Sequence, residues 1–102
     1  MVKQTQVNYQ RGFKVLGGNE RSQSAVMVLA QGESTGGPNN EHANSDQWLF
    51  VVSGVGQVTV RSQTVDLKAG SLVLIEKGET HEITNTGDEP LKTINIYVPP
   101  AY

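Results

Sequence analysis

Residues 70–85 read GSLVLIEKGETHEITN, and this stretch decides the fold class. An apolar run at 71–75 is followed by a glycine turn at 77–79 and by a second extended segment at 80–84. Short runs bounded by such turns are typical of β-strands. Because the first run is apolar throughout, we expect that strand to be buried on both faces. His81 stands at the start of the second strand.

Similar short segments lie on both sides of this stretch. Apolar and polar residues alternate on either side of Ser62-Gln63, which predicts a hairpin turning there. Residues 31–45 are rich in Gly, Asn, Ser and Pro and predict one long loop, which is where function often resides. The segments expected to be extended are 13–16, 25–30, 47–52, 58–61, 64–67, 71–75, 80–84 and 93–98.

The composition agrees with a chain made of strands. Val, Ile and Thr supply 25 of the 102 residues, whereas Ala and Leu supply 12. The longest interval without Gly or Pro, residues 39–53, leaves little room for helices. Seven or eight strands must form a sandwich or close into a barrel to hide their edges, and we favour a small antiparallel β-barrel. At this length we expect one domain, residues 1–102.

Charge and cysteine content exclude several classes of function. The formal net charge is −2 and no run of like charges occurs, so nucleic acid is not an expected partner. The chain has no cysteine, which excludes disulfides, thiolate metal sites and a cysteine nucleophile. No apolar stretch approaches the roughly 18–20 residues that span a bilayer, and the first residues do not resemble a signal peptide. We therefore expect a soluble, cytoplasmic domain without a membrane partner.

The strand at 47–52 is apolar on both faces. Trp48 and Phe50 share one face, and Leu49 and Val51 share the other. Something must therefore cover the outer face, either the N-terminal strands or a second subunit, and we expect a homodimer. Trp48 and Phe50 are interpreted as core or interface residues and not as ligand-stacking groups.

The candidate site residues surround the two histidines of the chain, His42 and His81. Asn44 lies two residues after His42 and would face the same way in an extended segment. Gln47 has the opposite parity and joins them only if the chain bends near residues 45–46.

These segments resemble the two motifs of the cupin superfamily. Gly36, His42 and Gly54 fit the first motif, whereas Asn44 stands where a second histidine belongs and Gln47 stands where a glutamate belongs. Four residues match the second motif at its spacing, and Glu76 stands where that motif has a proline. The four matching residues are Gly70, Gly78, His81 and Asn85. The resemblance covers about half the chain. It implies a double-stranded β-helix, or jelly roll, with a divalent metal such as Ni, Zn, Fe or Mn inside.

The resemblance implies that His42, Asn44, Gln47 and His81 form the metal site. Two imidazoles and two amide oxygens are all neutral, so we expect weaker metal binding than with a carboxylate. The histidines can also pair without a metal, and the amides can hydrogen-bond a ligand or the histidines instead. Glu41, Asp46 and Glu82 are not placed by strand parity to add charge inside.

Two classes of function follow from this site. The first is a non-catalytic module that binds a small polar molecule in the barrel through these four residues, with or without a divalent metal in the pocket. The second, implied by the resemblance, is a metal-dependent dioxygenase, isomerase or decarboxylase. We favour binding and assign no catalytic residue, because the second histidine and the glutamate of the family pattern are replaced. A serine hydrolase is not expected, since no Gly-x-Ser-x-Gly sequence occurs.

Overall fold

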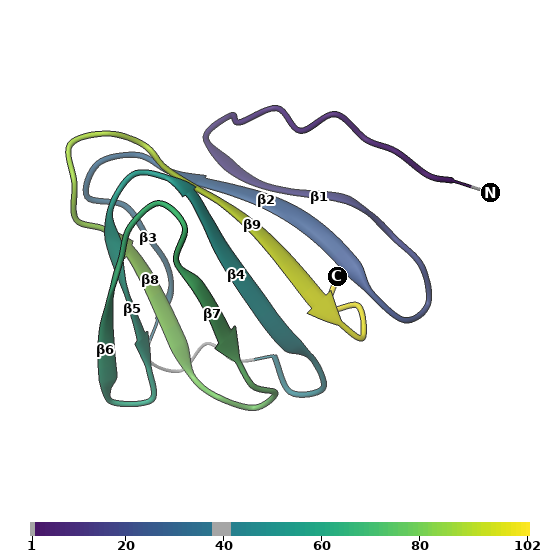
Figure 1. Cartoon of the computed structure of the whole chain (residues 1–102). Coiled ribbons are helices and arrows are strands. Elements are labelled where there is room, and N and C mark those ends of the chain that lie inside the picture. The colour runs from purple at the N-terminus through teal and green to yellow at the C-terminus, as the bar shows by residue number, and fades with distance from the viewer. Residues whose placement is uncertain (1, 38–41) are drawn as a thin grey trace.

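The computed structural model describes residues 2–37 and 42–102, and the regular elements in these ranges are β-strands (Figure 1). Within the same ranges, there is no helix of the length and apolarity that a membrane crossing requires. The strands of the described ranges are β1 (Gly12–Gly18), β2 (Gln23–Leu29), β3 (Ser34–Gly37), β4 (Asp46–Ser53), β5 (Gly56–Val60), β6 (Gln63–Leu67), β7 (Leu72–Ile75), β8 (His81–Asn85) and β9 (Leu91–Val98).

The strands form two antiparallel sheets that face each other (Figure 1). The larger sheet has the order β1-β2-β9-β4-β7, and the smaller has the order β3-β8-β5-β6. The expected all-β, jelly-roll class is confirmed. In the part of the chain that the structure describes, ladder pairing stays within each sheet, so the molecule is a pair of facing sheets more than a continuously bonded ring. The four-residue edge strands β3 and β7 offer few backbone groups for pairing between the sheets.

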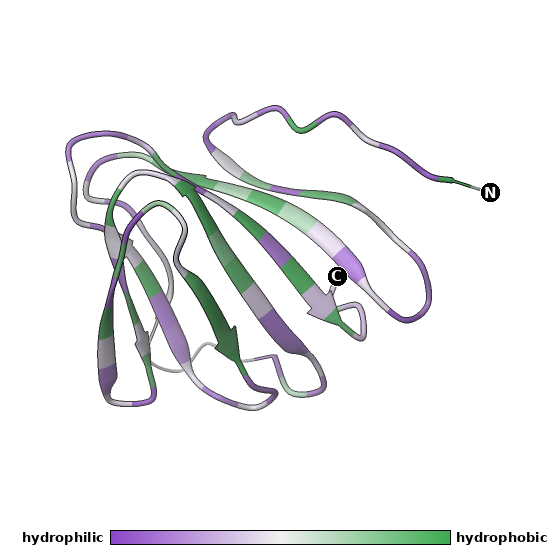
Figure 2. Cartoon of the chain, in the orientation of Figure 1, coloured by the Kyte–Doolittle hydropathy of each residue, from purple (hydrophilic) through white to green (hydrophobic). Residues whose placement is uncertain are grey.

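The core lies between the two sheets, and buried and less buried residues alternate along β4, β8 and β9. β7 is hydrophobic throughout and β4 is largely so (Figure 2). On β4, Leu49 and Val51 are fully buried, whereas Trp48 and Phe50 on the opposite face are 41% and 42% exposed. Burying each large apolar side chain contributes about 1.5–3 kcal/mol, so this cluster is the main stabilising feature of the fold. Its buried members are Met27, Leu29, Leu49, Val51, Val58, Leu67, Ile75, Ile83 and Leu91.

The register between β4 and β9 stacks the inner side chains in layers. Beyond Leu91, the buried residues of β9 are polar or aromatic, and its isoleucines, Ile94 and Ile96, lie on the half-buried outer face. The inner cross-strand pairs are Gln47 and Tyr97, Leu49 and Asn95, and Val51 and Thr93. Polar and aromatic side chains therefore line the inner face of β9 from Thr93 to Tyr97, beside Leu49 and Val51 of β4.

Two sequence predictions are corrected by this architecture. The loop expected at 31–45 contains the strand β3, which forms because Ser34–Gly37 pairs with β8, with Gly37 opposite His81. Its sequence, Ser-Thr-Gly-Gly, has weak β-propensity, so pairing and not local preference makes it extended. The strand expected to be buried on both faces, β7, instead exposes Leu72 and Leu74 by 60% and 40%.

Asn85, which the second motif singled out, closes the turn between β8 and β9. Its Nδ2 donates to the carbonyl oxygens of Leu29 and Glu89 at 2.9 and 2.8 Å. Its Oδ1 accepts a hydrogen bond from the Gly87 N–H at 2.9 Å. Since the Asn85 side chain is buried and its amide is fully used, this residue has a structural role.

Candidate functional site

His81 is the first residue of β8 and is 3% exposed on the inner face of the smaller sheet. Its Nδ1 lies 3.3 Å from the carbonyl oxygen of Glu79, in the turn that leads into the strand. A carbonyl oxygen can only accept, so Nδ1 carries the proton and Nε2 keeps a lone pair. Holding one ring nitrogen on a backbone carbonyl is a typical arrangement for a histidine that binds a cation through the other.

His42 approaches from the segment before β4. Its carbonyl oxygen accepts a hydrogen bond of 2.8 Å from the Gly78 N–H, which ties this segment to the turn before β8. The ring centroids of His42 and His81 lie 5.3 Å apart, although 39 positions separate the two residues in sequence. The structure therefore brings together the two histidines that the sequence singled out.

Both imidazoles have a pKa below the ordinary histidine value of 6.5. For His42 the main cause is burial, and the nearby His81 lowers its pKa further. For His81 burial lowers the pKa, and the hydrogen bond to Glu79 opposes part of that effect. The pair is therefore neutral at pH 7 and presents lone pairs instead of two positive charges.

Gln47 also faces the interior, because the chain turns at residues 43–44 before β4 begins. Its parity predicted a bend near residues 45–46, and the turn of the structure lies two residues earlier. Its residue is 3% exposed, and its Nε2 donates to Asn95 Oδ1 at 3.0 Å. Its Oε1 is buried and has no hydrogen-bond partner among residues 2–37 and 42–102. An unpaired buried acceptor costs about 1–3 kcal/mol, and a cation or a donor from a ligand would relieve that cost.

Asn44 lies outside this buried group. It is exposed in the turn at 43–44 and, with His42, lines an open depression of about 260 Å³. The other lining residues of this depression are Ala43, Ser45, Pro100 and Ala101. Its position beside His42 leaves its metal-binding role a prediction.

Two tyrosines that the sequence did not single out complete the site. Tyr97 and Tyr102 pack edge-on against His42, with centroid distances of 5.1 and 5.5 Å. Tyr102 Oη is 3.5 Å from His42 Nε2, and its ring also contacts Phe13 at 4.8 Å between centroids. Burial raises the pKa of Tyr97, so its phenol stays protonated. The alternation at 93–98 could have indicated Tyr97, but nothing local indicates Tyr102.

The carboxylates near this end are used elsewhere. Asp46 Oδ1 accepts a hydrogen bond of 2.9 Å from the Lys77 N–H, and Glu82 lies on the opposite face of β8 from His81. Glu41 lies outside the described residues. Among residues 2–37 and 42–102, no three His, Asp or Glu side chains converge on one point. The interior donors are therefore two imidazoles and one amide oxygen.

This donor set fits a weakly held divalent cation. Two imidazoles binding one ion at about 2.1 Å place their ring centres about 5 Å apart, which is close to the observed separation. Gln47 is the cross-strand neighbour of Tyr97, whose ring packs on His42, so its Oε1 would be the third, oxygen donor. Because all three donors are neutral, the full charge of the ion would remain at the site.

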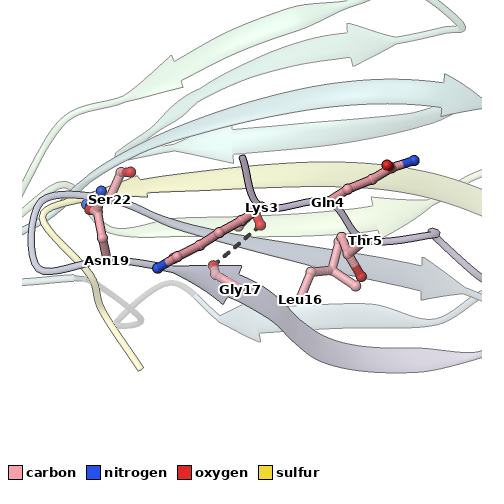
Figure 3. Close-up of a pocket in the computed structure, with 9 residues that line it drawn as sticks. Lys3, Gln4, Thr5, Leu16, Gly17, Asn19 and Ser22 are labelled. Carbon is pink, nitrogen blue, oxygen red and sulfur yellow. Dashed lines mark hydrogen bonds between the residues drawn. The ribbon is translucent and has the colours of Figure 1, made fainter. Parts of the chain in front are cut away.

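A larger depression, of about 580 Å³, lies away from the histidines (Figure 3). It is formed by the N-terminal segment and the hairpin of β1 and β2, with lining residues that include Lys3, Thr5 and Asn19. Lys3 is the one cationic side chain among its lining residues, all of which are exposed or half-buried. The histidine end remains the candidate site.

The family comparison rests on the same part of the fold. The family model for the cupin domain matches residues 25–97, which include most of β2 and β9 and both histidines. The chain belongs to the cupin family.

Individual relatives of this cupin agree with the family assignment. The uncharacterized protein YrkC of Bacillus subtilis is 33% identical over 86 residues, covering 78% of this chain and 45% of that protein. An oxalate-binding protein of Thermotoga maritima is 28% identical over 74 residues, covering 72% of this chain and 60% of the relative. A crystal structure from Bacillus halodurans has a TM-score of 0.84 and 28% identity, covering 90% of this chain and 73% of that one. This cupin spans about half the length of the curated relatives it matches.

Proposed function

We propose that this cupin binds a small polar molecule at its histidine end, with a divalent cation held by His42, His81 and Gln47 as part of the site. The observation that carries the proposal is the convergence of two neutral imidazoles, 5.3 Å apart, from segments distant in sequence. Neutral imidazoles in a half-buried site favour a cation over an anion as their direct partner.

The two histidines and two tyrosines of the protein would each contribute to binding such a ligand. His81 presents its free Nε2 inward because Nδ1 is held by Glu79. His42 is positioned by the hydrogen bond of its carbonyl group to Gly78. When bound, the cation supplies positive charge that attracts oxygen atoms of the small molecule. Tyr97 and Tyr102 form the aromatic wall on which that molecule would pack.

The ligand class is supported by the oxalate-binding relative. A small molecule rich in carboxylate oxygens suits a site in which a cation keeps its full charge. Oxalate is therefore the first probe, and acetate, with a single carboxylate, is the matched comparison.

Metal content tests the cation directly. We expect protein purified without chelator to hold divalent metal, and the variant with both His42→Ala and His81→Ala to hold none. Titration calorimetry of Ni²⁺ into metal-stripped protein should show binding that the double variant loses. Oxalate is then titrated into metal-loaded and metal-free protein. Equal metal content in both proteins would contradict the cation site, and equal oxalate binding with and without metal would contradict its role in holding the ligand.

A further inference from the structure

The buried amide of Gln47 belongs to a row of hydrogen-bonded polar side chains along the inner face of the larger sheet. Thr93 Oγ1 donates to the carbonyl oxygen of Met27 at 3.2 Å. Asn95 Nδ2 donates to Thr93 Oγ1 at 3.1 Å, and Gln47 Nε2 donates to Asn95 Oδ1 at 3.0 Å. Thr93 and Asn95 are 0% exposed and Gln47 is 3% exposed, so water does not compete for these bonds.

The donor-to-acceptor direction of the hydrogen bonds in this row is fixed at its Met27 end. A backbone carbonyl can only accept, and a threonine hydroxyl has a single hydrogen. Once Thr93 donates to Met27, its oxygen can only accept, so Asn95 must turn its NH₂ group toward Thr93. Asn95 Oδ1 then faces Gln47 as an acceptor, so Gln47 must donate to it from its own NH₂ group. The carbonyl oxygen Oε1 of Gln47 is the last atom of this row, and it is buried without a partner in the part of the chain that the structure describes.

We infer that Thr93 and Asn95 are positioning residues that hold Gln47 with its oxygen, and not its NH₂ group, free for the ligand. Gln47 is the cross-strand neighbour of Tyr97, whose ring packs on His42, so this oxygen belongs to the inner layer that adjoins the histidines. The matching ligand atom is a cation or an N–H or O–H donor. The choice of a cation rests on the proposed function, whereas the orientation of the amide does not.

The reverse orientation would have the opposite selectivity. If Gln47 turned its NH₂ group to the ligand, Asn95 would have to donate to Gln47 and accept from Thr93. Thr93 would then give up its bond to Met27, leaving a buried carbonyl oxygen without that partner. A free NH₂ group would favour an anion. The Thr93 hydroxyl therefore determines whether Gln47 favours a cation or an anion, although it lies two layers away from the histidines.

The orientation can be measured on the wild-type protein without any ligand. In ¹⁵N-edited NOE spectra we expect the side-chain amide protons of Gln47 to show contacts to the β-protons of Asn95 and slow exchange with solvent. Contacts to the ring protons of Tyr97 in place of those to Asn95 would overturn the inference. This measurement decides the question even if a Thr93 variant fails to fold or no metal binds.

The positioning role is tested by Thr93→Val against Thr93→Ser, with Ni²⁺ alone as the probe. Valine keeps the shape and removes the hydroxyl, so it should lower Ni²⁺ affinity by about tenfold to a hundredfold. Serine restores the hydroxyl and should restore affinity and the Gln47 amide spectrum. Unchanged affinity and spectrum in Thr93→Val would overturn the positioning role. If the wild type binds no Ni²⁺, the cation of the proposed function is wrong, and the Gln47 NOE pattern alone decides the inference.

Discussion

The Gly78 N–H donates a hydrogen bond of 2.8 Å to the carbonyl oxygen of His42. This bond joins the two histidine-bearing segments through their backbones, so the imidazoles are brought together without the help of a bound ligand. Gly78 itself has a φ of 78°, a conformation that glycine adopts more easily than other residues. The turn before β8 is therefore a part of the site as well as a connection.

Gly78→Ala should weaken both the fold and the site. An alanine at this φ costs about 1–2 kcal/mol, and relaxation of the turn would move the N–H that holds His42. Gly70→Ala is the matched control, because Gly70 has a φ of 91° and its N–H donates to Val51, away from the histidines. Urea unfolding should show similar losses of stability for both, with Ni²⁺ affinity lowered in Gly78→Ala alone. Equal affinities in the two variants would argue against this role of the turn.

The low histidine pKa values predict a loss of stability in mild acid. Because the pKa of both His42 and His81 is below 6.5 in the folded state, the unfolded chain binds protons first as the pH falls. Their contribution is complete above pH 6.5 and is lost as the pH falls through the folded pKa values. The hydrogen bond from Arg11 lowers the pKa of Glu33, so Glu33 affects the free energy of unfolding only at a pH near or below the ordinary glutamate pKa.

Urea unfolding at pH 7.5, 6.5 and 5.5 checks this expectation. The free energy of unfolding should decrease over this range, and a double variant with His42→Gln and His81→Gln should show a flatter dependence. A wild-type profile as flat as that of the double variant would rule out the histidines as the source.

Tyr102 should limit access to His42. Its ring packs on the His42 imidazole, and Gln23 holds its backbone, with Oε1 accepting from the Tyr102 N–H at 2.9 Å and Nε2 donating to its carbonyl oxygen at 2.7 Å. Tyr102→Ala should increase severalfold the rate at which diethyl pyrocarbonate modifies His42. Tyr102→Phe keeps the ring and should react nearly as the wild type does. If phenylalanine opens the site as much as alanine, the hydroxyl contact and not the ring controls access.

The outer face of the larger sheet should be covered by a second copy of the chain. Trp48 lies opposite Leu74 and Phe50 lies opposite Leu72, so four exposed large apolar side chains form one patch. Leu72→Lys should shift the sedimentation of the protein from dimer to monomer while its circular dichroism stays unchanged. The control is Val65→Lys, at an exposed valine of the other sheet. A wild type that sediments as a monomer at micromolar concentration would exclude this dimer.

Most of the fold could be predicted from local patterns. The hairpin of β5 and β6 and the strand β8 follow from alternation and turn residues, and their positions agree with the expected segments. β3 could not be predicted, because Ser-Thr-Gly-Gly becomes a strand only by pairing with β8. The exposure of Leu72 and Leu74 was also missed, since an apolar run does not reveal which neighbours cover it.

The site was predicted only in part for a related reason. Spacing singled out His42 and His81, and the bend that would bring in Gln47 was recognised as a requirement. Tyr102 escaped because its contact with His42 spans 60 positions and has no local signature. The burial of Thr93 and Asn95 on β9 could not be predicted either. Alternation shows that the two faces of a strand differ, but it does not show which face points inward.

The separation of the site from the core has a consequence for evolution. The histidines lie at the start of β8 and in the segment before β4, whereas every buried member of the aliphatic cluster lies outside residues 42–47 and 76–81. Residues 42–47 and 76–81 could therefore be exchanged for those of another cupin without altering most of the packing that keeps the molecule folded. New specificities can arise in this scaffold by replacing two short peptides, which separates the acquisition of a ligand from the risk of unfolding.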